Sequence, residues 1–360
     1  MTSTPESSTT RPDFPYPTLL GLVEHYSPSG QEKAAVDWLV ERIAGLGFWR
    51  AFADPAGNAV GVMGDGSRQA ILLGHIDTVP GEIPVRVEED ILYGRGSVDA
   101  KGPLAAFVDA VAATGALPGW QFVVIGAVEE ERDSTGARSI VEHYRPDFVI
   151  VGEPSRWERI TLGYKGSAWA EITVRQAKAH SASRAESACE QAVALWSAIQ
   201  SWATNYNAIQ ERVFDQLQIS LRGLSSGEDG FEEWASLRVG ARLPLAFSPA
   251  DWHARLENLA PGAQVQHSGF AIPAYQADKH TLLVRAFLAG IRSAGGKPGF
   301  VLKTGTADLN IVAPAWGCPA LAYGPGDSAL DHTPVEHLQL SEYAQALLVL
   351  QAALKRLCEE

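Results

Sequence analysis

Four segments of the chain place side chains of metal-ligating types where a buried strand ends or a helix begins. The apolar run 70–74 stops at His75, and Asp77 follows two residues later. A second apolar run ends in three consecutive glutamates, Glu129 to Glu131, and a third ends in Glu153. Asp99 lies in a glycine-rich loop that opens a helical segment. Because ligands of open α/β sheets bind at the carboxyl ends of strands, these side chains can converge although they are far apart in the sequence.

Each of these residues has an ordinary structural explanation when it is taken alone. Asp99 is most simply a helix N-cap, and Glu153 a solvated loop residue. The three adjacent glutamates are harder to explain in this way, since their charges repel one another unless cations neutralise them. A cluster rich in carboxylates with few histidines is typical of a pair of divalent cations. The pattern therefore predicts a two-metal centre, with zinc as the first choice and cobalt or manganese as alternatives.

The elements that must hold these residues follow from the hydrophobic periodicity. Apolar runs of strand length occur at 58–63, 69–74, 120–128 and 147–152. Helical spacing of apolar residues predicts helices over 17–27, 32–47 and 102–117. Buried strands that alternate with helices predict an α/β fold, built on a doubly wound and mostly parallel sheet.

A different order of elements begins near Gly166. The pattern predicts strands over 167–176, 214–224, 232–245 and 263–272, with helices over 184–206 and 249–260. This β-α-β-β-α-β order is that of a ferredoxin-like α+β sandwich. After about Pro273 the first pattern resumes, with helices over 279–296 and 341–357. We therefore expect a flexible tail over 1–15, a metal-binding catalytic domain made of 16–165 and 273–360, and an inserted α+β domain over 166–272.

Composition and charge limit the classes of partner. The formal net charge of −13 argues against nucleic acid, because binding to phosphates needs patches of Lys and Arg. Apolar runs stay below the roughly 18 residues that a membrane span needs, and the polar start is unlike a secretory signal. The 3 cysteines are widely spaced, which fits neither a disulfide framework nor a cysteine zinc site. These features predict a cytoplasmic protein.

The motifs resemble those of the two-metal amidohydrolase and peptidase family that includes acetylornithine deacetylase and succinyl-diaminopimelate desuccinylase. The resemblance covers nearly the whole chain, and GYKGS (163–167) resembles the junction to the inserted domain of that family. The segments that carry it are GHIDTVP (74–80), GRGSVDAKG (94–102), EEE (129–131), VGEPS (151–155) and GPGDSALDHTPVEHL (324–338).

The resemblance implies a set of metal ligands. His75, Asp99 and Glu153 would bind one ion. Asp99, Glu131 and His332 would bind the other, so that Asp99 bridges the two. Two metal ions would supply Lewis acidity and an activated water for the hydrolysis of an amide.

The resemblance also implies two residues that act beside the metals. Asp77 would orient the imidazole of His75. Glu130 would be the general base that deprotonates the attacking water and then protonates the leaving amine. The family pattern is usually Asp-Glu-Glu, and the GAR downstream aligns Glu129 with that Asp. An alignment shifted by one residue would instead make Glu129 the base and Glu130 the ligand.

Four further residues resemble substrate-binding positions of the family. His180 resembles a lid histidine that stabilises the oxyanion from a partner subunit, and Arg242 resembles a clamp for the substrate carboxylate. Gly305 and Thr306 lie in a glycine-containing loop whose N–H groups could cradle a carboxylate. The alternative interpretation of His180 is an exposed loop histidine, and that of Arg242 a surface arginine.

Within the family, the motifs are most similar to those of carrier-protein lysine hydrolases. Such enzymes release lysine, or ornithine, from the C-terminal glutamate side chain of a small amino-group carrier protein. The alternatives are a deacylase of N-acyl amino acids such as acetylornithine, a peptidase, and a binding module that has lost the chemistry. Because such carriers are acidic and this chain is acidic too, the first interpretation needs a local basic patch at the mouth of the site. The resemblance also implies that the inserted domain over 166–272 is a lid and dimerisation domain, and we expect a homodimer formed through it.

Overall fold

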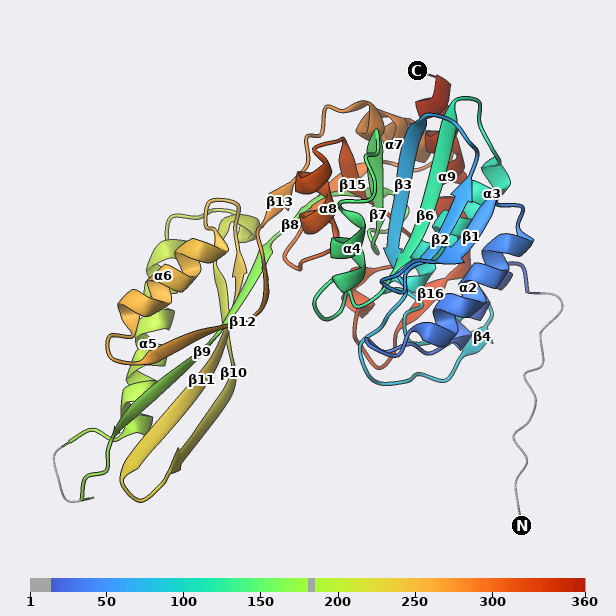
Figure 1. Cartoon of the computed structure of the whole chain (residues 1–360). Coiled ribbons are helices and arrows are strands. Elements are labelled where there is room, and N and C mark those ends of the chain that lie inside the picture. Colours follow the sequence, from blue (N-terminus) through green and yellow to red (C-terminus); the bar gives the residue numbers. More distant parts are fainter. Residues whose placement is uncertain (1–13, 181–184, 360) are drawn as a thin grey trace, which may run out of the picture.

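The computed structural model describes residues 14–180 and 185–359. Residues 1–13 of the predicted tail therefore lie outside the described residues. The chain forms a large domain and a small domain that are joined side by side (Figure 1). It passes into the small domain between β8 and β9 and returns between β12 and β13. None of the described helices is long and apolar enough to span a membrane.

The large domain is built on a mixed nine-stranded sheet. The strand order is β1-β2-β6-β3-β7-β15-β8-β13, and β14 also pairs with β8. The strands β6, β3, β7 and β15 run parallel in the middle, whereas β1, β2, β8 and β13 pair with antiparallel neighbours. The predicted α/β class with a mostly parallel sheet is therefore confirmed. The strands are β1 (Arg50–Ala53), β2 (Ala59–Met63), β3 (Arg68–His75), β6 (Trp120–Ala127), β7 (Phe148–Gly152), β8 (Arg159–Tyr164), β13 (Tyr275–Gln276), β14 (Gly299–Lys303) and β15 (Ala320–Ala322).

Helices cover both faces of this sheet, and they bury alternate residues of each central strand. In β3, Leu72 packs into the core beneath one set of helices, while Ile71 and Leu73 pack into the core on the opposite face. Burial of both faces explains why the strands read as unbroken apolar runs. The helices of the first face are α1 (Pro17–Glu24), α2 (Lys33–Gly45), α3 (Lys101–Thr114), α7 (Leu282–Ser293) and α9 (Leu340–Glu359); those of the second are α4 (Thr135–Ile140) and α8 (Leu309–Trp316).

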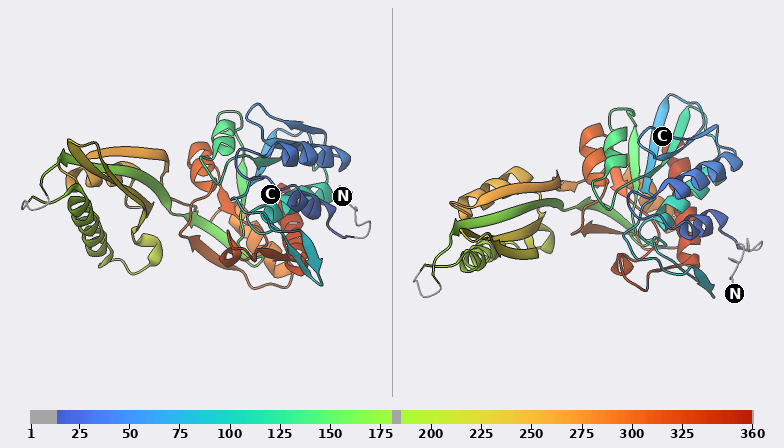
Figure 2. Two further views of the ribbon diagram at one scale, coloured as in Figure 1. Left: turned by 90° about the horizontal axis from the view of Figure 1, so that it is seen from below. Right: turned by 60° about the horizontal axis from the view of Figure 1, so that its bottom comes forward.

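The small domain has the ferredoxin-like order that the sequence predicts. Its antiparallel sheet has the order β10-β11-β9-β12, and α5 and α6 cover one face of it (Figure 2). A capping box of Ser187 and Glu190 begins α5, and Trp252 of α6 is fully buried in the core. The elements are β9 (Gly166–Ala177), α5 (Ala188–Asn207), β10 (Gln218–Glu228), β11 (Glu232–Leu243), α6 (Pro249–Leu259) and β12 (Gln264–Ile272).

The large domain also contains a short three-stranded sheet, whose Leu92 and Leu338 pack into the core of that domain. Its order is β16-β5-β4, and its strands are β4 (Arg86–Glu88), β5 (Ile91–Tyr93) and β16 (His337–Gln339). The segment between β5 and α3 carries Asp99, and the segment before β16 carries His332. The pairing of β5 with β16 thus brings together two loops that are far apart in the sequence.

Candidate metal centre

His75 is the last residue of β3, and its side chain is only 2% exposed. Its Nδ1 lies 3.0 Å from the carbonyl oxygen of Asp77, and its Nε2 lies 3.2 Å from Oδ1 of Asp99. Burial lowers the pKa of His75, but hydrogen bonds with Asp77 and Asp99 outweigh burial and raise that pKa well above its usual value. The strand therefore ends in an imidazole that is held between two acidic residues.

Asp99 presents one carboxylate oxygen to each of two imidazoles. Its Oδ1 faces His75, and its Oδ2 lies 3.0 Å from Nε2 of His332. Although burial opposes its charge, hydrogen bonds from His332 and His75 hold the pKa of Asp99 well below its usual range. Asp99 does not cap α3, because the N-cap residue is Ala100 and no side chain caps that end. Asp99 therefore lies between two imidazoles, with one carboxylate oxygen turned toward each of them.

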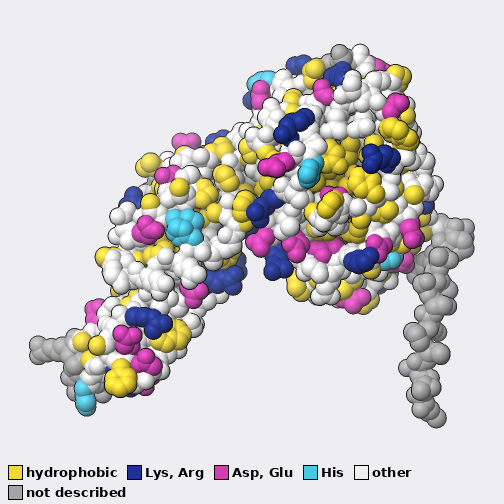
Figure 3. Space-filling view, in the orientation of Figure 1, with side chains coloured by type: hydrophobic (Ala, Val, Ile, Leu, Met, Phe, Trp, Pro, Cys, Tyr) yellow, Lys and Arg dark blue, Asp and Glu magenta, His cyan; other side chains and the backbone are white. Residues whose placement is uncertain are grey.

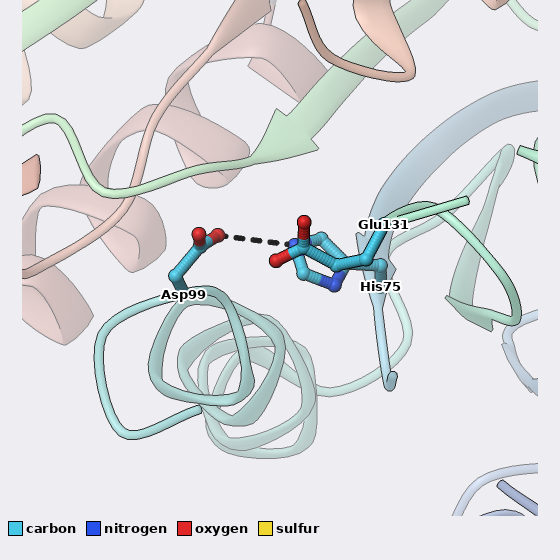
Figure 4. Close-up of side chains that lie close together, drawn as sticks. All are labelled: His75, Asp99 and Glu131. Atoms are coloured by element: carbon cyan, nitrogen blue, oxygen red, sulfur yellow. Dashed lines mark hydrogen bonds and ion pairs between the residues drawn. The ribbon is translucent and has the colours of Figure 1, made fainter. Parts of the chain in front are cut away.

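Glu131 and His332 complete this cluster from loops after β6 and β15. Oε1 of Glu131 lies 2.8 Å from Nε2 of His332, and hydrogen bonds with Asp99 and Glu131 raise the pKa of His332 to about 10. One ligand atom from each of His75, Asp99 and Glu131 lies within 4.8 Å of the others (Figure 4). Glu153 follows β7 and lines one cavity together with Asp99, Glu131 and His332, and burial raises its pKa to about 8.

This set of donors fits a pair of divalent cations. Two imidazoles and several carboxylates are ligands that zinc, cobalt and manganese accept. Carboxylates this close together and poorly solvated repel one another unless protons or cations balance their charges. Burial is the main cause of the raised pKa values of Glu131 and Glu153, and the negative charge of nearby carboxylates raises them further.

Asp77 supports both His75 and the glutamate segment. It is fully buried, and its Oδ1 lies 3.4 Å from Nδ1 of His75. Its carboxylate accepts hydrogen bonds from the hydroxyl of Ser29 at 2.7 Å and from the N–H groups of Glu130 and Glu131 at 3.0 and 3.1 Å. Asp77 therefore fixes the backbone that carries two of the predicted site residues, a contact that the sequence did not indicate.

The three consecutive glutamates point in different directions. Glu130 and Glu131 line the cavity that holds Asp99, whereas Glu129 lies 3.7 Å from Arg132 and lines a separate hollow beside α2. Burial, reinforced by nearby acidic residues, raises the pKa of Glu130 well above its usual value. This geometry favours the alignment in which Glu130 is the base and Glu131 the ligand.

The cavity of ≈ 480 Å³ also contains three of the four predicted substrate-binding residues. Arg242 reaches it from β11 of the small domain and donates a hydrogen bond to Oγ1 of Thr306. Gly305 lies next to Thr306 in the cavity wall. His180 is not brought to this cavity within one chain. It is exposed and follows β9 by three residues. Figure 1 shows that β9 runs away from the large domain toward the remote end of the small domain.

Several buried charged residues near the cluster were missed in the sequence. Nζ of Lys101 donates to the carbonyl of His25 at 2.6 Å, and burial lowers the pKa of this lysine to about 7. Asp308 is almost fully buried, and burial raises its pKa to about 6. Arg95 and Glu336 form a buried ion pair of 2.8 Å. Only their position inside or close to the motif segments could have drawn attention to them.

Comparison with known proteins agrees with this geometry. The family model "Peptidase family M20/M25/M40" matches residues 71–356, a range that includes every residue of the cluster from His75 to His332. The chain belongs to peptidase family M20/M25/M40. The resemblance deduced from the motifs is thereby confirmed, and this M20 chain is a hydrolase.

Two M20-type relatives and one solved structure make the comparison more specific. The LysW-lysine hydrolase of Deinococcus radiodurans is 44% identical over 366 residues, which cover 99% of this chain and 99% of the relative. The putative LysW-lysine/LysW-ornithine hydrolase of Thermococcus kodakarensis is 40% identical and covers 93% of this chain and 90% of the relative. The crystal structure of the Bacillus subtilis YXEP protein, a dinuclear metal binding peptidase from the M20 family, has a TM-score of 0.66 at 14% identity, covering 94% of this chain and 96% of that chain.

Proposed function

We propose that this M20 hydrolase releases lysine, or ornithine, from the side chain of the C-terminal glutamate of an amino-group carrier protein. The observation that carries the proposal is the placement of Asp99 between two imidazoles beside Glu130, in a chain 44% identical over its full length to a LysW-lysine hydrolase. A lone cluster of this kind would support only metal-dependent hydrolysis. The full-length similarity adds the substrate.

Two divalent cations are proposed as cofactors, with zinc as the first choice and cobalt or manganese as alternatives. His75, Asp99 and Glu153 would hold one ion, and Asp99, Glu131 and His332 the other. When bound, such ions polarise a carbonyl group and make water acidic enough to attack it near neutral pH.

The protein groups around the cluster would carry out the proton transfers and hold the substrate. Glu130 takes a proton from the attacking water and passes it to the leaving amine of lysine. Its raised pKa suits a group that must both accept and donate a proton. Arg242, with Thr306 and Gly305 beside it, would bind the free carboxylate of the lysine, since a guanidinium pairs with carboxylates through two parallel hydrogen bonds.

A carrier-linked substrate needs an open approach to Glu130, and a hollow between the two domains offers one. This hollow of ≈ 460 Å³ shares Glu130 and Arg242 with the cavity of the cluster. Its wall also includes Arg132 of the large domain and Arg238 of the small domain. Figure 3 shows Lys and Arg side chains on both sides of the gap between the domains, although the chain as a whole is acidic. The wall also contains Glu130, Glu131 and Asp133, and Arg132 lies 3.9 Å from Asp133. Arg238 and Arg242 therefore provide the main support for the docking of an acidic carrier at this hollow.

A release assay tests the proposed substrate. Metal-loaded enzyme is given carrier protein bearing γ-linked lysine in one reaction and N-acetylornithine in the other, with free amino acid measured in both. Release from the carrier alone is expected. Release only from N-acetylornithine would be compatible with the proposed metal centre, but it would identify the protein as a deacylase of N-acyl amino acids.

We also propose that the protein is a cytoplasmic homodimer in which the small domain of one chain brings His180 to the cavity of the other. Exposed apolar side chains on the small domain, Val193 of α5 and Leu224 of β10, suit such an interface. Sedimentation is expected to give a mass of twice 38.6 kDa. A monomer at all concentrations that support activity would contradict the proposal.

A further inference from the structure

Arg95 and Glu336 form an ion pair inside the large domain. Nη1 of Arg95 lies 2.8 Å from Oε2 of Glu336, and the two side chains are 7% and 1% exposed. Such a pair is a weak source of stability, because the loss of hydration offsets much of the attraction between the charges. Neither residue lines the cavity of the cluster. The contacts of the pair with its surroundings therefore have to explain its presence.

Glu336 fixes the peptide segment that carries Asp99. While its Oε2 pairs with Arg95, its Oε1 accepts hydrogen bonds from the N–H groups of Val98 and Asp99, each at 3.0 Å. Two N–H groups on one carboxylate oxygen define the path of the backbone immediately before the Asp99 side chain. The direction of that side chain toward His75 and His332 thus depends on Glu336.

Arg95 fixes two further loops of the cluster. Its Nε donates to the carbonyl of Gly81 at 2.9 Å, and its Nη1 donates to the carbonyl of Thr333 at 3.2 Å. Gly81 belongs to the loop that begins at His75, and Thr333 directly follows His332. The ion pair therefore connects the three loops 75–81, 94–99 and 332–336.

We propose that Arg95 and Glu336 are positioning residues, which hold these three loops at the separation that two divalent cations require. The planar guanidinium suits this task, since it offers several donors in one fixed plane. Residues that support metal ligands in this way commonly contribute a factor of about 10 to 100 to metal affinity or activity. The inference rests on the proposed two-metal centre, but it concerns residues that touch neither the metal positions nor the substrate cavity.

A double variant, Arg95→Met with Glu336→Gln, tests the role without leaving a buried charge unpaired. The amide oxygen of glutamine can still accept from Val98 and Asp99, whereas methionine cannot hold Gly81 or Thr333. Calorimetric titration of chelator-treated protein with Co²⁺ is the first measurement. We expect at least one of the two ions to bind about 10 to 100 times more weakly than in the wild type. We further expect kcat to fall at unchanged KM, and excess Co²⁺ to restore part of kcat.

The control is Arg86→Met with Glu88→Gln, which makes the same substitutions in an exposed pair of 2.7 Å. It should bind Co²⁺ as the wild type does. A double variant that loses thermal stability but keeps the wild-type Co²⁺ titration and kcat would show that the buried pair is merely structural, and would overturn the proposal.

A second variant decides the matter if the double variant does not fold. Arg95→Lys keeps the charge beside Glu336, but one ammonium cannot replace the fork that reaches both Gly81 and Thr333. Weaker Co²⁺ binding in this variant supports the positioning role, and wild-type binding refutes it. A wild-type protein that binds no Co²⁺ would instead refute the proposed metal centre itself, so the two failures are distinguishable.

Discussion

A Glu130→Gln variant is expected to bind metal ions as the wild type does and yet to lose most of its hydrolytic activity. Glu130 lines the cavity beside Asp99, but it makes neither of the imidazole contacts that define the cluster. Glutamine keeps the shape of the side chain and cannot take a proton from water. Removal of a general base lowers turnover by roughly 10² to 10⁴-fold. Metal content by mass spectrometry and kcat on the carrier-linked substrate are the two measurements.

Glu129→Gln is the matched control, because it changes the same residue type in the adjacent position. Glu129 faces Arg132 and a different hollow, so its loss should leave kcat close to that of the wild type. If Glu129→Gln abolished hydrolysis and Glu130→Gln instead reduced the metal content, the alignment shifted by one residue would be correct. The pair of variants therefore distinguishes the two assignments that the sequence left open.

The elements of the fold were predictable wherever burial imposed either a clear helical period or a continuous apolar run of strand length. The segment 70–74 reads as a continuous apolar run because Leu72 and its neighbours Ile71 and Leu73 are buried on opposite faces of the sheet. The apolar runs 58–63 and 120–128 are equally compatible with parallel and with antiparallel neighbours, so the antiparallel pairing of β2 with β6 could not be deduced. Short elements such as β4 and β13 have too few residues to show a period.

The convergence of the site residues was predictable because strand ends meet at one edge of a sheet. His75, Glu131 and Glu153 lie at or just after the ends of parallel strands. The structure places His75 and Glu131 in one cluster, and Glu131 and Glu153 in the wall of one cavity. The supports of the site were not predictable in this way. Arg95 and Glu336 lie 241 residues apart, and each alone is an ordinary charged residue. Only the pairing of β5 with β16 makes them neighbours.

An Asp99→Asn variant is expected to lose tight binding of the metal pair and, with it, hydrolysis. The two oxygens of Asp99 face different imidazoles, Oδ1 toward His75 and Oδ2 toward His332. An amide keeps only one of these oxygens, and its NH₂ group would face a position meant for a cation. The negative charge that serves both ions disappears as well. Metal ions supply several kcal/mol of transition-state stabilisation, so turnover should fall by about 10³-fold or more.

Asp109→Asn provides the control for this change, because Asp109 is a second aspartate of the same region, lying within α3. Its carboxylate accepts hydrogen bonds from the hydroxyls of Thr18 at 2.5 Å and Tyr343 at 2.8 Å, and burial raises its pKa. Asparagine keeps the size of the side chain, and a hydroxyl that donates to a carboxylate can instead accept from an NH₂ group, so this variant should keep both metal ions and its activity. Co²⁺ titration of the two variants side by side measures the difference. Two ions bound to Asp99→Asn with wild-type affinity would mean that Asp99 does not bridge them, and that the short contacts to His75 and His332 serve only to hold the loops together.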